Sequence, residues 1–371
     1  MARRQSLTPP LLPGYTYVRP LGSGGFADVF LFQQNMPRRL VAVKVLLSKV
    51  QDDASARALA AEADIMASLS SHPSILTVYE ASVSSDGRPY IVMEYCPTSL
   101  TNRYRNEKIP VAEVLSIGVK IASAVEAAHR AGLLHRDIKP SNILVTSFGH
   151  PVLSDFGVAS AVASGDTETI AMSPPWSAPE LVEHRSTGTI ATEVWALAAT
   201  VYTLLAQRSP FDVAGPGRAD ENALKTRIAK AKYTPTGRPE SPRELEGVLE
   251  GGMRRIPGDR YPTAAAFGQA LQWVEQSLGL PVTPMEIPTD EWAQASAIAA
   301  PDDSPRGPTR STVPVASQRL RRGSGTSSSA GTGTLRDAQA NRVGKGVIIG
   351  ALVGGVVLLG VVAGAVLSVL G

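Results

Sequence analysis

A glycine-rich turn near the N-terminus has the residue types needed to bind a phosphate chain. The stretch from Leu21 to Val29 reads Leu-Gly-Ser-Gly-Gly-Phe-Ala-Asp-Val and lies between two runs with strand character, 15–20 and 29–32. Because glycines lack a side chain, the backbone amides of such a turn can approach a phosphate closely. A simple hairpin between two strands has the same pattern, so this turn alone leaves both interpretations open.

Three further segments supply what a nucleotide site needs. A strand-like run of valines carries one lysine, Lys44, whose charge suits the α- and β-phosphates of a nucleotide. Glu62 lies in residues 57–69, which have helical periodicity, and its carboxylate could hold Lys44 through an ion pair. The apolar strand at 90–95 leads into a turn at Cys96, where backbone groups could receive an adenine edge. Each segment by itself is also typical of ordinary surface or core structure.

A later series of motifs makes the pattern specific. Residues 135–142 read His-Arg-Asp-Ile-Lys-Pro-Ser-Asn, residues 155–157 read Asp-Phe-Gly, and residues 178–180 read Ala-Pro-Glu. With these motifs in this order, the sequence resembles the eukaryotic-type (Hanks-type) serine/threonine protein kinases, and in particular the membrane-anchored kinases of bacteria. The resemblance covers residues 15–278, which we expect to form the catalytic domain.

The resemblance implies both a fold and a reaction. The expected fold is an α+β, bilobal protein kinase-like fold, in which a small β lobe is joined by a hinge near Tyr95 and Cys96 to a larger helical lobe. ATP is expected in the cleft between the lobes. The implied activity is transfer of the γ-phosphate of ATP to serine or threonine hydroxyls of protein substrates, with autophosphorylation. The pair Lys139-Pro140 resembles the serine/threonine class and not the tyrosine class.

The motifs also imply individual roles. Asp137 matches the aspartate that orients the substrate hydroxyl and accepts its proton, and Lys139 is expected to meet the γ-phosphate. Asn142 and Asp155 match the ligands of Mg²⁺, with Mn²⁺ as an alternative, because oxygen donors suit a hard cation. The residues expected to bind ATP are Leu21, Gly22, Gly24, Val29, Ala42, Lys44, Glu62, Glu94, Cys96, Asn142 and Asp155.

The chain departs from the family pattern at several positions. Ala27 replaces the third glycine of the phosphate-binding turn, which should stiffen the turn without abolishing binding. Ser173 replaces the usual threonine, so its hydroxyl is expected to contact the catalytic aspartate and lysine. Glu193 replaces the aspartate that braces the catalytic loop, and its extra methylene is expected to alter that brace. Glu180 and Arg260 retain the pair expected to form a buried ion pair.

Regulation by phosphorylation is a further hypothesis. The activation segment is expected to span residues 158–177, and Thr167 and Thr169 in its middle are the candidate phosphorylation sites. The Arg136 guanidinium, next to the catalytic aspartate, could pair with a phosphate there. Threonines in a polar loop are also common without any regulatory role, so both interpretations stay open.

Composition limits the other function classes. The chain has 371 residues, with 36 Lys and Arg against 33 Asp and Glu, which lacks the basic excess expected of a dedicated nucleic-acid-binding protein. Its single cysteine, Cys96, cannot form an intramolecular disulfide, which favours a reducing compartment such as the cytoplasm.

The C-terminal part of the chain has a different character. Residues 279–346 are rich in Pro, Ser, Thr and Gly, which predicts a disordered juxtamembrane linker. Residues 347–370 contain no charged residue and as a helix would reach about 36 Å, enough to cross a bilayer core of about 30 Å. This predicts a transmembrane helix, and Arg342 and Lys345 before it place the catalytic domain in the cytoplasm of a single-pass membrane protein.

Two alternatives follow from these patterns. Gly350 and Gly354 recur at four-residue spacing in the predicted membrane helix, which could allow a homodimer, although glycines are common in such helices anyway. A pseudokinase that binds partners without turnover is the alternative to an active enzyme. The active kinase is favoured by the presence of Lys44, Asp137, Asn142 and Asp155.

Overall fold

The computed structural model describes residues 8–24, 27–46, 66–156, 173–212 and 221–287. All of them belong to one compact unit. The predicted partner of Lys44, Glu62, lies outside these ranges, as do the candidate phosphorylation sites Thr167 and Thr169 and the predicted membrane helix at 347–370. Within the described ranges, no helix combines the length and the apolar character needed to cross a membrane.

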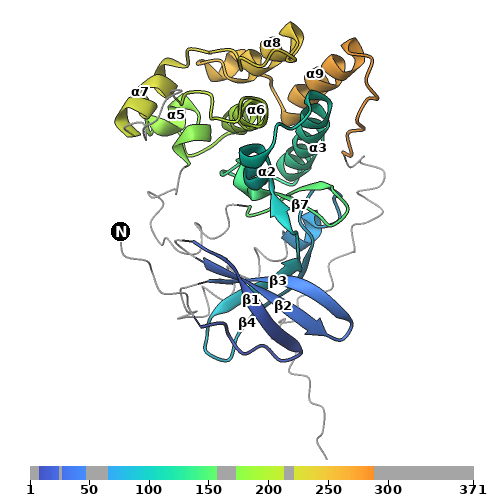
Figure 1. Cartoon of the computed structure of the whole chain (residues 1–371). Coiled ribbons are helices and arrows are strands. Elements are labelled where there is room, and N and C mark those ends of the chain that lie inside the picture. Colours follow the sequence, from blue (N-terminus) through green and yellow to red (C-terminus); the bar gives the residue numbers. More distant parts are fainter. Residues whose placement is uncertain (1–7, 25–26, 47–65, 157–172, 213–220, 288–371) are drawn as a thin grey trace, which may run out of the picture. The chain divides into compact units, whose positions relative to one another are not determined.

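The N-terminal part of this unit is a five-stranded antiparallel sheet with strand order β1-β2-β3-β5-β4. Its strands, at the bottom of Figure 1, are β1 (Tyr15–Ser23), β2 (Ala27–Asn35), β3 (Arg38–Leu46), β4 (Val78–Val83) and β5 (Pro89–Glu94). Successive side chains of a strand point to opposite faces of a sheet. Val41 and Val43 of β3 therefore pack with Phe30 and Phe32 on one face, and Ala42 packs with Leu76 on the other. Lys44, two residues after Ala42, shares the face of Ala42.

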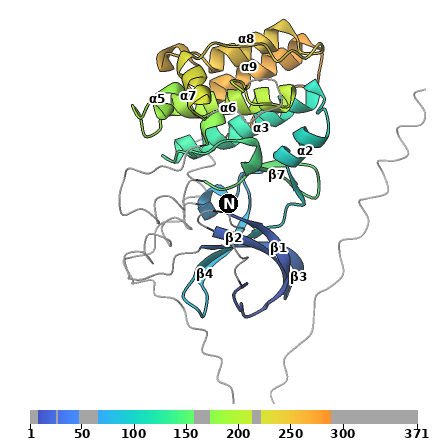
Figure 2. The ribbon, with the colours of Figure 1, turned by 60° about the vertical axis from the view of Figure 1, so that its left-hand side comes forward.

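The larger part is helical. Its elements are α2 (Leu100–Asn106), α3 (Val111–Arg130), η2 (Pro174–Trp176), α5 (Pro179–Val182), α6 (Ile190–Ala206), α7 (Glu221–Lys230), α8 (Arg243–Gly252), η3 (Pro257–Asp259) and α9 (Ala264–Ser277). Helix α6 begins with a capping box formed by Thr189 and Thr192. Trp195 and Tyr202 of α6 are fully buried. Helix α6 contacts α3, α8 and α9, and α3 contacts α9, so α6 is the centre of the helical core (Figure 2).

A small second sheet lies between the five-stranded sheet and the helices (Figures 1 and 2). It consists of β6 (Thr98–Ser99), β7 (Ile143–Val145) and β8 (Pro151–Leu153), paired in that order. The short helix η1 (Pro140–Asn142) leads directly into β7. This arrangement confirms the predicted two-lobed α+β architecture, with β6 following the segment that joins the lobes.

The ordered chain continues beyond α9, where the sequence predicts a disordered linker from residue 279. Residues 279–287 instead lie against α9 and α3, and we call this segment the strap. Leu280 N–H donates to Glu275 O at 2.9 Å, and the Gln272 side chain donates to Thr283 O at 2.7 Å. The first nine residues of the predicted linker, 279–287, are therefore packed on the domain, which corrects the predicted start of the linker.

Candidate active site

The segment between α3 and η1 holds the predicted catalytic aspartate in a constrained backbone. His135 is fully buried, and its Nδ1 accepts the Asp137 N–H at 3.2 Å while Nε2 donates to Ser154 O at 2.8 Å. Burial lowers the pKa of His135, against smaller effects of the Glu193 charge and the Ser154 bond, so the ring is neutral. Arg136 has a φ of 67°, which is unfavourable for a residue other than glycine. Such strain is typical of functional loops.

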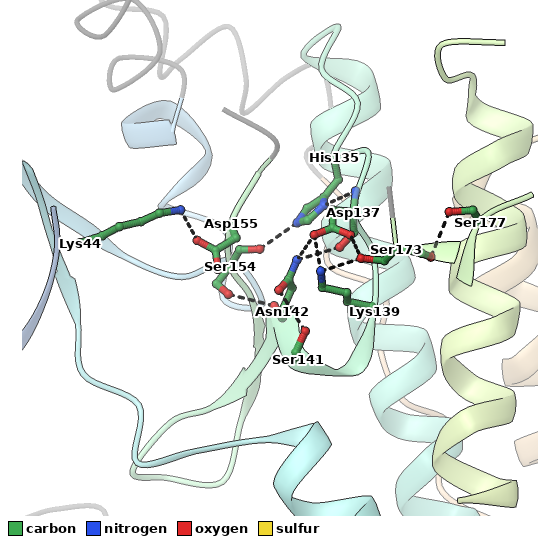
Figure 3. Close-up of polar contacts among 10 residues, drawn as sticks. All are labelled: Lys44, His135, Asp137, Lys139, Ser141, Asn142, Ser154, Asp155, Ser173 and Ser177. Atoms are coloured by element: carbon green, nitrogen blue, oxygen red, sulfur yellow. Dashed lines mark hydrogen bonds and ion pairs between the residues drawn. The ribbon is translucent and has the colours of Figure 1, made fainter. Parts of the chain in front are cut away.

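Three side chains converge on the carboxylate of Asp137 (Figure 3). Asp137 Oδ1 accepts the Ser173 hydroxyl at 2.8 Å, and Oδ2 lies 2.6 Å from Lys139 Nζ. Asn142 Nδ2 donates to Oδ2 at 3.0 Å and to the Asp137 carbonyl at 2.8 Å. Lys139 Nζ also donates to Ser173 Oγ at 2.7 Å. The Asp137 side chain is still 27% exposed, so one incoming hydroxyl can reach it.

Lys44 of β3 pairs with Asp155, which follows β8. The distance from Lys44 Nζ to Asp155 Oδ1 is 2.5 Å, and the two side chains are drawn together in Figure 3. Asp155 also has a left-handed backbone, with a φ of 57°. Packing around this carboxylate raises its pKa, but the charge and hydrogen bond of Lys44 outweigh that effect and lower the pKa overall. Asp155 is therefore an anion held opposite a fixed positive charge.

A cavity of about 330 Å³ opens beside Asp155, a size suited to a small-molecule ligand. Its wall includes these predicted ATP-binding residues: Leu21, Gly22, Val29, Ala42, Glu94, Cys96 and Asp155. Of the other predicted residues, Gly24 donates from its backbone to Ala27 O at 2.8 Å, closing the phosphate-binding turn. Lys44 lies in the ion pair with Asp155, and Asn142 lies in the cluster around Asp137. Neither residue is part of the cavity wall.

Sequence reasoning missed several residues of this cavity. Leu76, Met93 and Leu144 provide apolar surface, and Arg19 lies at the wall with its guanidinium 3.3 Å from Tyr95 Oη. Leu144 lies between the buried Ile143 and Val145 in β7, so strand alternation could have suggested that it faces the opposite side, toward the cavity. Nothing in the local sequence of Leu76 or Arg19 indicates a binding site.

Cys96 lines the cavity at the segment joining the lobes. Burial, together with the nearby negative charge of Glu94, raises the pKa of its thiol to about 12. The thiol is therefore neutral at physiological pH and contributes an apolar surface. The place of Cys96 in the cavity wall suits the backbone contacts predicted for an adenine edge.

Asn142 and Asp155 fit the chemistry of a magnesium site. The Asn142 amide nitrogen is turned toward Asp137, so its Oδ1 faces away and has only a 3.3 Å contact with the Ser141 hydroxyl. The Asp155 side chain is 45% exposed beside the cavity. Within the described part of the chain, no group of three or more His, Cys, Asp or Glu side chains gathers as a complete metal cage. A small number of protein ligands is sufficient for Mg²⁺, because this ion usually keeps waters and substrate phosphates as its other ligands.

Two buried carboxylates brace this site from the helical core. Glu193 Oε1 accepts the Arg136 N–H at 2.5 Å, and its Oε2 lies 2.6 Å from His129 Nε2. The longer side chain predicted to alter the brace therefore reaches both the catalytic loop and α3. Glu180 binds Arg260 through two bonds of 2.7 and 2.9 Å, and both side chains are almost completely buried. This is the buried ion pair expected from the sequence.

Comparisons with known proteins agree with this geometry. The sequence model of one family, described as "Protein kinase domain", matches residues 15–270. Serine/threonine-protein kinase PknK of Mycobacterium bovis is 38% identical over 298 residues, which cover 78% of this chain and 26% of PknK. Serine/threonine-protein kinase PrkC of Bacillus subtilis is 33% identical over 256 residues, which cover 67% of this chain and 39% of PrkC. The matched region thus spans well under half the length of these curated relatives.

A solved structure shows the same arrangement. The crystal structure of the Mycobacterium tuberculosis PknI kinase domain superposes with a TM-score of 0.51 at 29% sequence identity. The superposition covers 72% of this chain and 98% of the PknI kinase domain. The similarity therefore includes nearly the whole of that domain.

Proposed function

This chain belongs to the protein kinase family, and we propose that it transfers the γ-phosphate of ATP to serine or threonine hydroxyls of protein substrates. The observation that carries the proposal is the Asp137 carboxylate, which is bound by Lys139, Asn142 and Ser173 and is still accessible. The names of PknK and PrkC support the choice of serine and threonine as acceptors.

The residues of this site have separate tasks in the proposed reaction. Asp137 orients the attacking hydroxyl and accepts its proton, while Lys139 and Lys44 stabilise negative charge on the phosphates. Because phosphoryl transfer depends mainly on positioning and charge stabilisation, fixed hydrogen bonds around Asp137 are what the chemistry requires. Mg²⁺ held by Asn142 and Asp155 would neutralise phosphate charge when bound.

The test is Asp137→Asn in the full chain, with labelled ATP and Mg²⁺ and mass spectrometry of the phosphorylated residues. Asparagine preserves the shape of the side chain but is a poor proton acceptor, so phosphate transfer should fall by about 10²- to 10⁴-fold. ATP binding should be largely unchanged. Asp86→Asn, in the turn between β4 and β5, makes the same chemical change away from the site and should retain activity. Transfer by wild type that is no faster than by Asp137→Asn, with both at the level of a reaction without protein, would support a binding protein without turnover.

Autophosphorylation of the activation segment is part of the proposal. Thr167 and Thr169 are the predicted sites, and the exposed Arg136 side chain beside Asp137 could pair with a phosphate. Replacement of both threonines by alanine should lower the activity of a chain first incubated with ATP. The same replacement should leave the activity of phosphatase-treated protein unchanged. Equal activities before and after phosphatase treatment in the wild type would refute this regulation.

We further propose that the chain works at the cell membrane in signalling, with its catalytic domain in the cytoplasm. The support is the sequence of residues 347–370 and the basic residues before it. The full chain should stay in the membrane fraction after alkaline carbonate extraction, and a chain ending at residue 346 should not. Homodimerisation through Gly350 and Gly354 is a separate hypothesis, and unchanged self-association after both are replaced by leucine would eliminate it.

A further inference from the structure

The strap is bound to α9 by a buried carboxylate. Glu275 is 1% exposed, and its Oε2 accepts the Thr283 N–H at 2.8 Å. Its Oε1 accepts the Thr283 hydroxyl at 2.7 Å. Thr283 itself is 8% exposed. Because a buried carboxylate without its hydrogen bonds is costly, these two bonds fix the middle of the strap.

Two residues later, the strap fills a notch between α9 and α3. A Cβ atom at Gly268 of α9 would lie 2.9 Å from Met285 Cε and 3.1 Å from Ala122 Cβ of α3. Met285 thus occupies space that only a glycine leaves free, and it packs against the core of the helical lobe. The strap is therefore held by side-chain packing as well as by hydrogen bonds.

The same stretch of α3 contacts the segment 66–77, which precedes β4. Ser123, next to Ala122, has its hydroxyl 3.2 Å from Nε2 of His72, and both residues are buried. His72 Nδ1 accepts the Ser74 N–H at 3.0 Å. Burial lowers the pKa of His72, while a backbone hydrogen bond and the charge of Glu286 in the strap act in the opposite direction. The strap therefore approaches His72 directly as well as through α3.

From His72 the connection continues to the nucleotide site. Leu76 N–H donates to Leu153 O at 2.9 Å, and Leu153 N–H donates to Ser74 O at 2.9 Å, so the segment 66–77 is paired with β8. Asp155 lies two residues after Leu153, and Leu76 also lines the cavity. The position of the segment 66–77 thus affects groups expected to bind Mg²⁺ and ATP.

We infer that the strap is a positioning element of the nucleotide site: Thr283 and Met285 hold the segment 66–77 in place, and through β8 they hold Asp155. This inference rests on the proposed kinase function. It assigns a task to residues 279–287, which follow the region matched by the family model, residues 15–270. Release of the strap loosens the segment 66–77 and weakens binding of Mg²⁺ and ATP.

The test uses the full chain with Thr283→Val, which removes the hydroxyl and keeps the side-chain shape. Thr283→Ser is the conservative variant that retains the hydroxyl, and Val282→Ala is a matched control at an exposed strap position. Thr283→Val should raise the KM for ATP about 3- to 10-fold with a smaller change in kcat, because the hydroxyl bond to the buried Glu275 carboxylate is lost. Thr283→Ser and Val282→Ala should behave like wild type. Met285→Ala should reproduce the effect of Thr283→Val by a different route.

Hydrogen exchange provides a second measurement that does not need activity. Thr283→Val and Met285→Ala should speed amide exchange in residues 66–77 and 151–155 as well as in the strap. Faster exchange in the strap alone, with an unchanged KM for ATP, would overturn the inference and leave the proposed kinase function intact. If wild type transfers no phosphate, the kinase proposal fails, and exchange in residues 66–77 still decides whether the strap positions this segment.

Discussion

At the scale of single residues, Ser173 shows how a small change of side chain can preserve a function. Its hydroxyl donates to Asp137 at 2.8 Å and accepts from Lys139 at 2.7 Å, so it holds an anion and a cation at fixed positions. The backbone here is anchored separately, because the Ser177 hydroxyl donates to Ser173 O at 3.0 Å. The hydroxyl can therefore be removed without moving the loop.

Ser173→Ala should lower kcat about 10-fold, equivalent to about 1.4 kcal/mol of transition-state stabilisation. The KM for ATP should be nearly unchanged, because Ser173 is not in the wall of the ATP cavity. Ser173→Thr restores the hydroxyl and should recover most of the activity in steady-state assays. A KM for ATP that rises as much as kcat falls would show that Ser173 acts on nucleotide binding instead.

The sequence predicts contacts at this scale when the residues are close in the chain or belong to a fixed motif. Asp137, Lys139 and Asn142 lie within six residues of one another, and their grouping follows from the loop that carries them. The partner of Lys44 is different. The sequence predicts Glu62, which lies outside the described residues, and the structure places Asp155 beside Lys44. Lys44 and Asp155 are 111 residues apart in the sequence, so only the fold determines which carboxylate pairs with this lysine.

At the scale of secondary-structure elements, Glu193 joins α6, α3 and the catalytic loop. It is 2% exposed, and its two oxygens separately bind the Arg136 N–H and His129 Nε2. His129 is 64 residues away in sequence, so no local pattern predicts this contact. An aspartate, which is shorter by one methylene, could not span the same two groups without movement of the helices.

Glu193→Asp should therefore lower the free energy of unfolding by about 1–3 kcal/mol, because one buried group loses its hydrogen bond. It should also lower kcat, since Arg136 precedes Asp137. Urea denaturation measures the first effect and steady-state kinetics the second. Glu183→Asp, at a partly exposed position outside this brace, is the control and should change stability little. Full stability of Glu193→Asp would mean that the helices adjust to the shorter side chain.

The strap shows why composition alone misjudged the end of the domain. Residues 279–287 include prolines and a threonine, and such composition predicts a linker. Their order depends instead on distant features of the fold: the buried Glu275 carboxylate and the space left by Gly268. Neither feature can be recognised from the strap itself. Sequence-based boundaries are therefore weakest where a short segment without regular secondary structure packs on the core of the domain.

At the scale of the described unit, two buried histidines join segments that are distant in sequence, and both rings are neutral. His135 joins the catalytic loop to Ser154 after β8, and His72 joins the segment before β4 to α3. Each uses one ring nitrogen as a donor and the other as an acceptor, an arrangement available only to neutral imidazole. Protonation of either ring would add a hydrogen to Nδ1, which would then face a backbone N–H instead of accepting a hydrogen bond from it.

Folding stability should consequently fall as the pH decreases below about 6.5, the ordinary pKa of histidine. Burial lowers the pKa of both His72 and His135 in the native protein, whereas the unfolded chain binds protons with ordinary affinity. The unfolded state therefore binds more protons in this range, so the stabilising contribution is complete above pH 6.5 and is lost as the pH falls toward the native pKa values. The lowered pKa of Asp155 adds a further loss at more acidic pH, below its ordinary value of 3.8.

Thermal unfolding between pH 8 and pH 5 measures this effect, and Tm should be nearly constant down to pH 7 and then decrease. His72→Gln, which retains a hydrogen-bonding side chain but does not titrate, should show a shallower decrease than wild type between pH 7 and pH 5. His150→Gln changes an exposed histidine and should leave the slope unaltered. A Tm that rises from pH 7 to pH 5 would mean that protonated forms of these buried rings are stabilised, most directly by Glu193 near His135 and by Glu286 near His72.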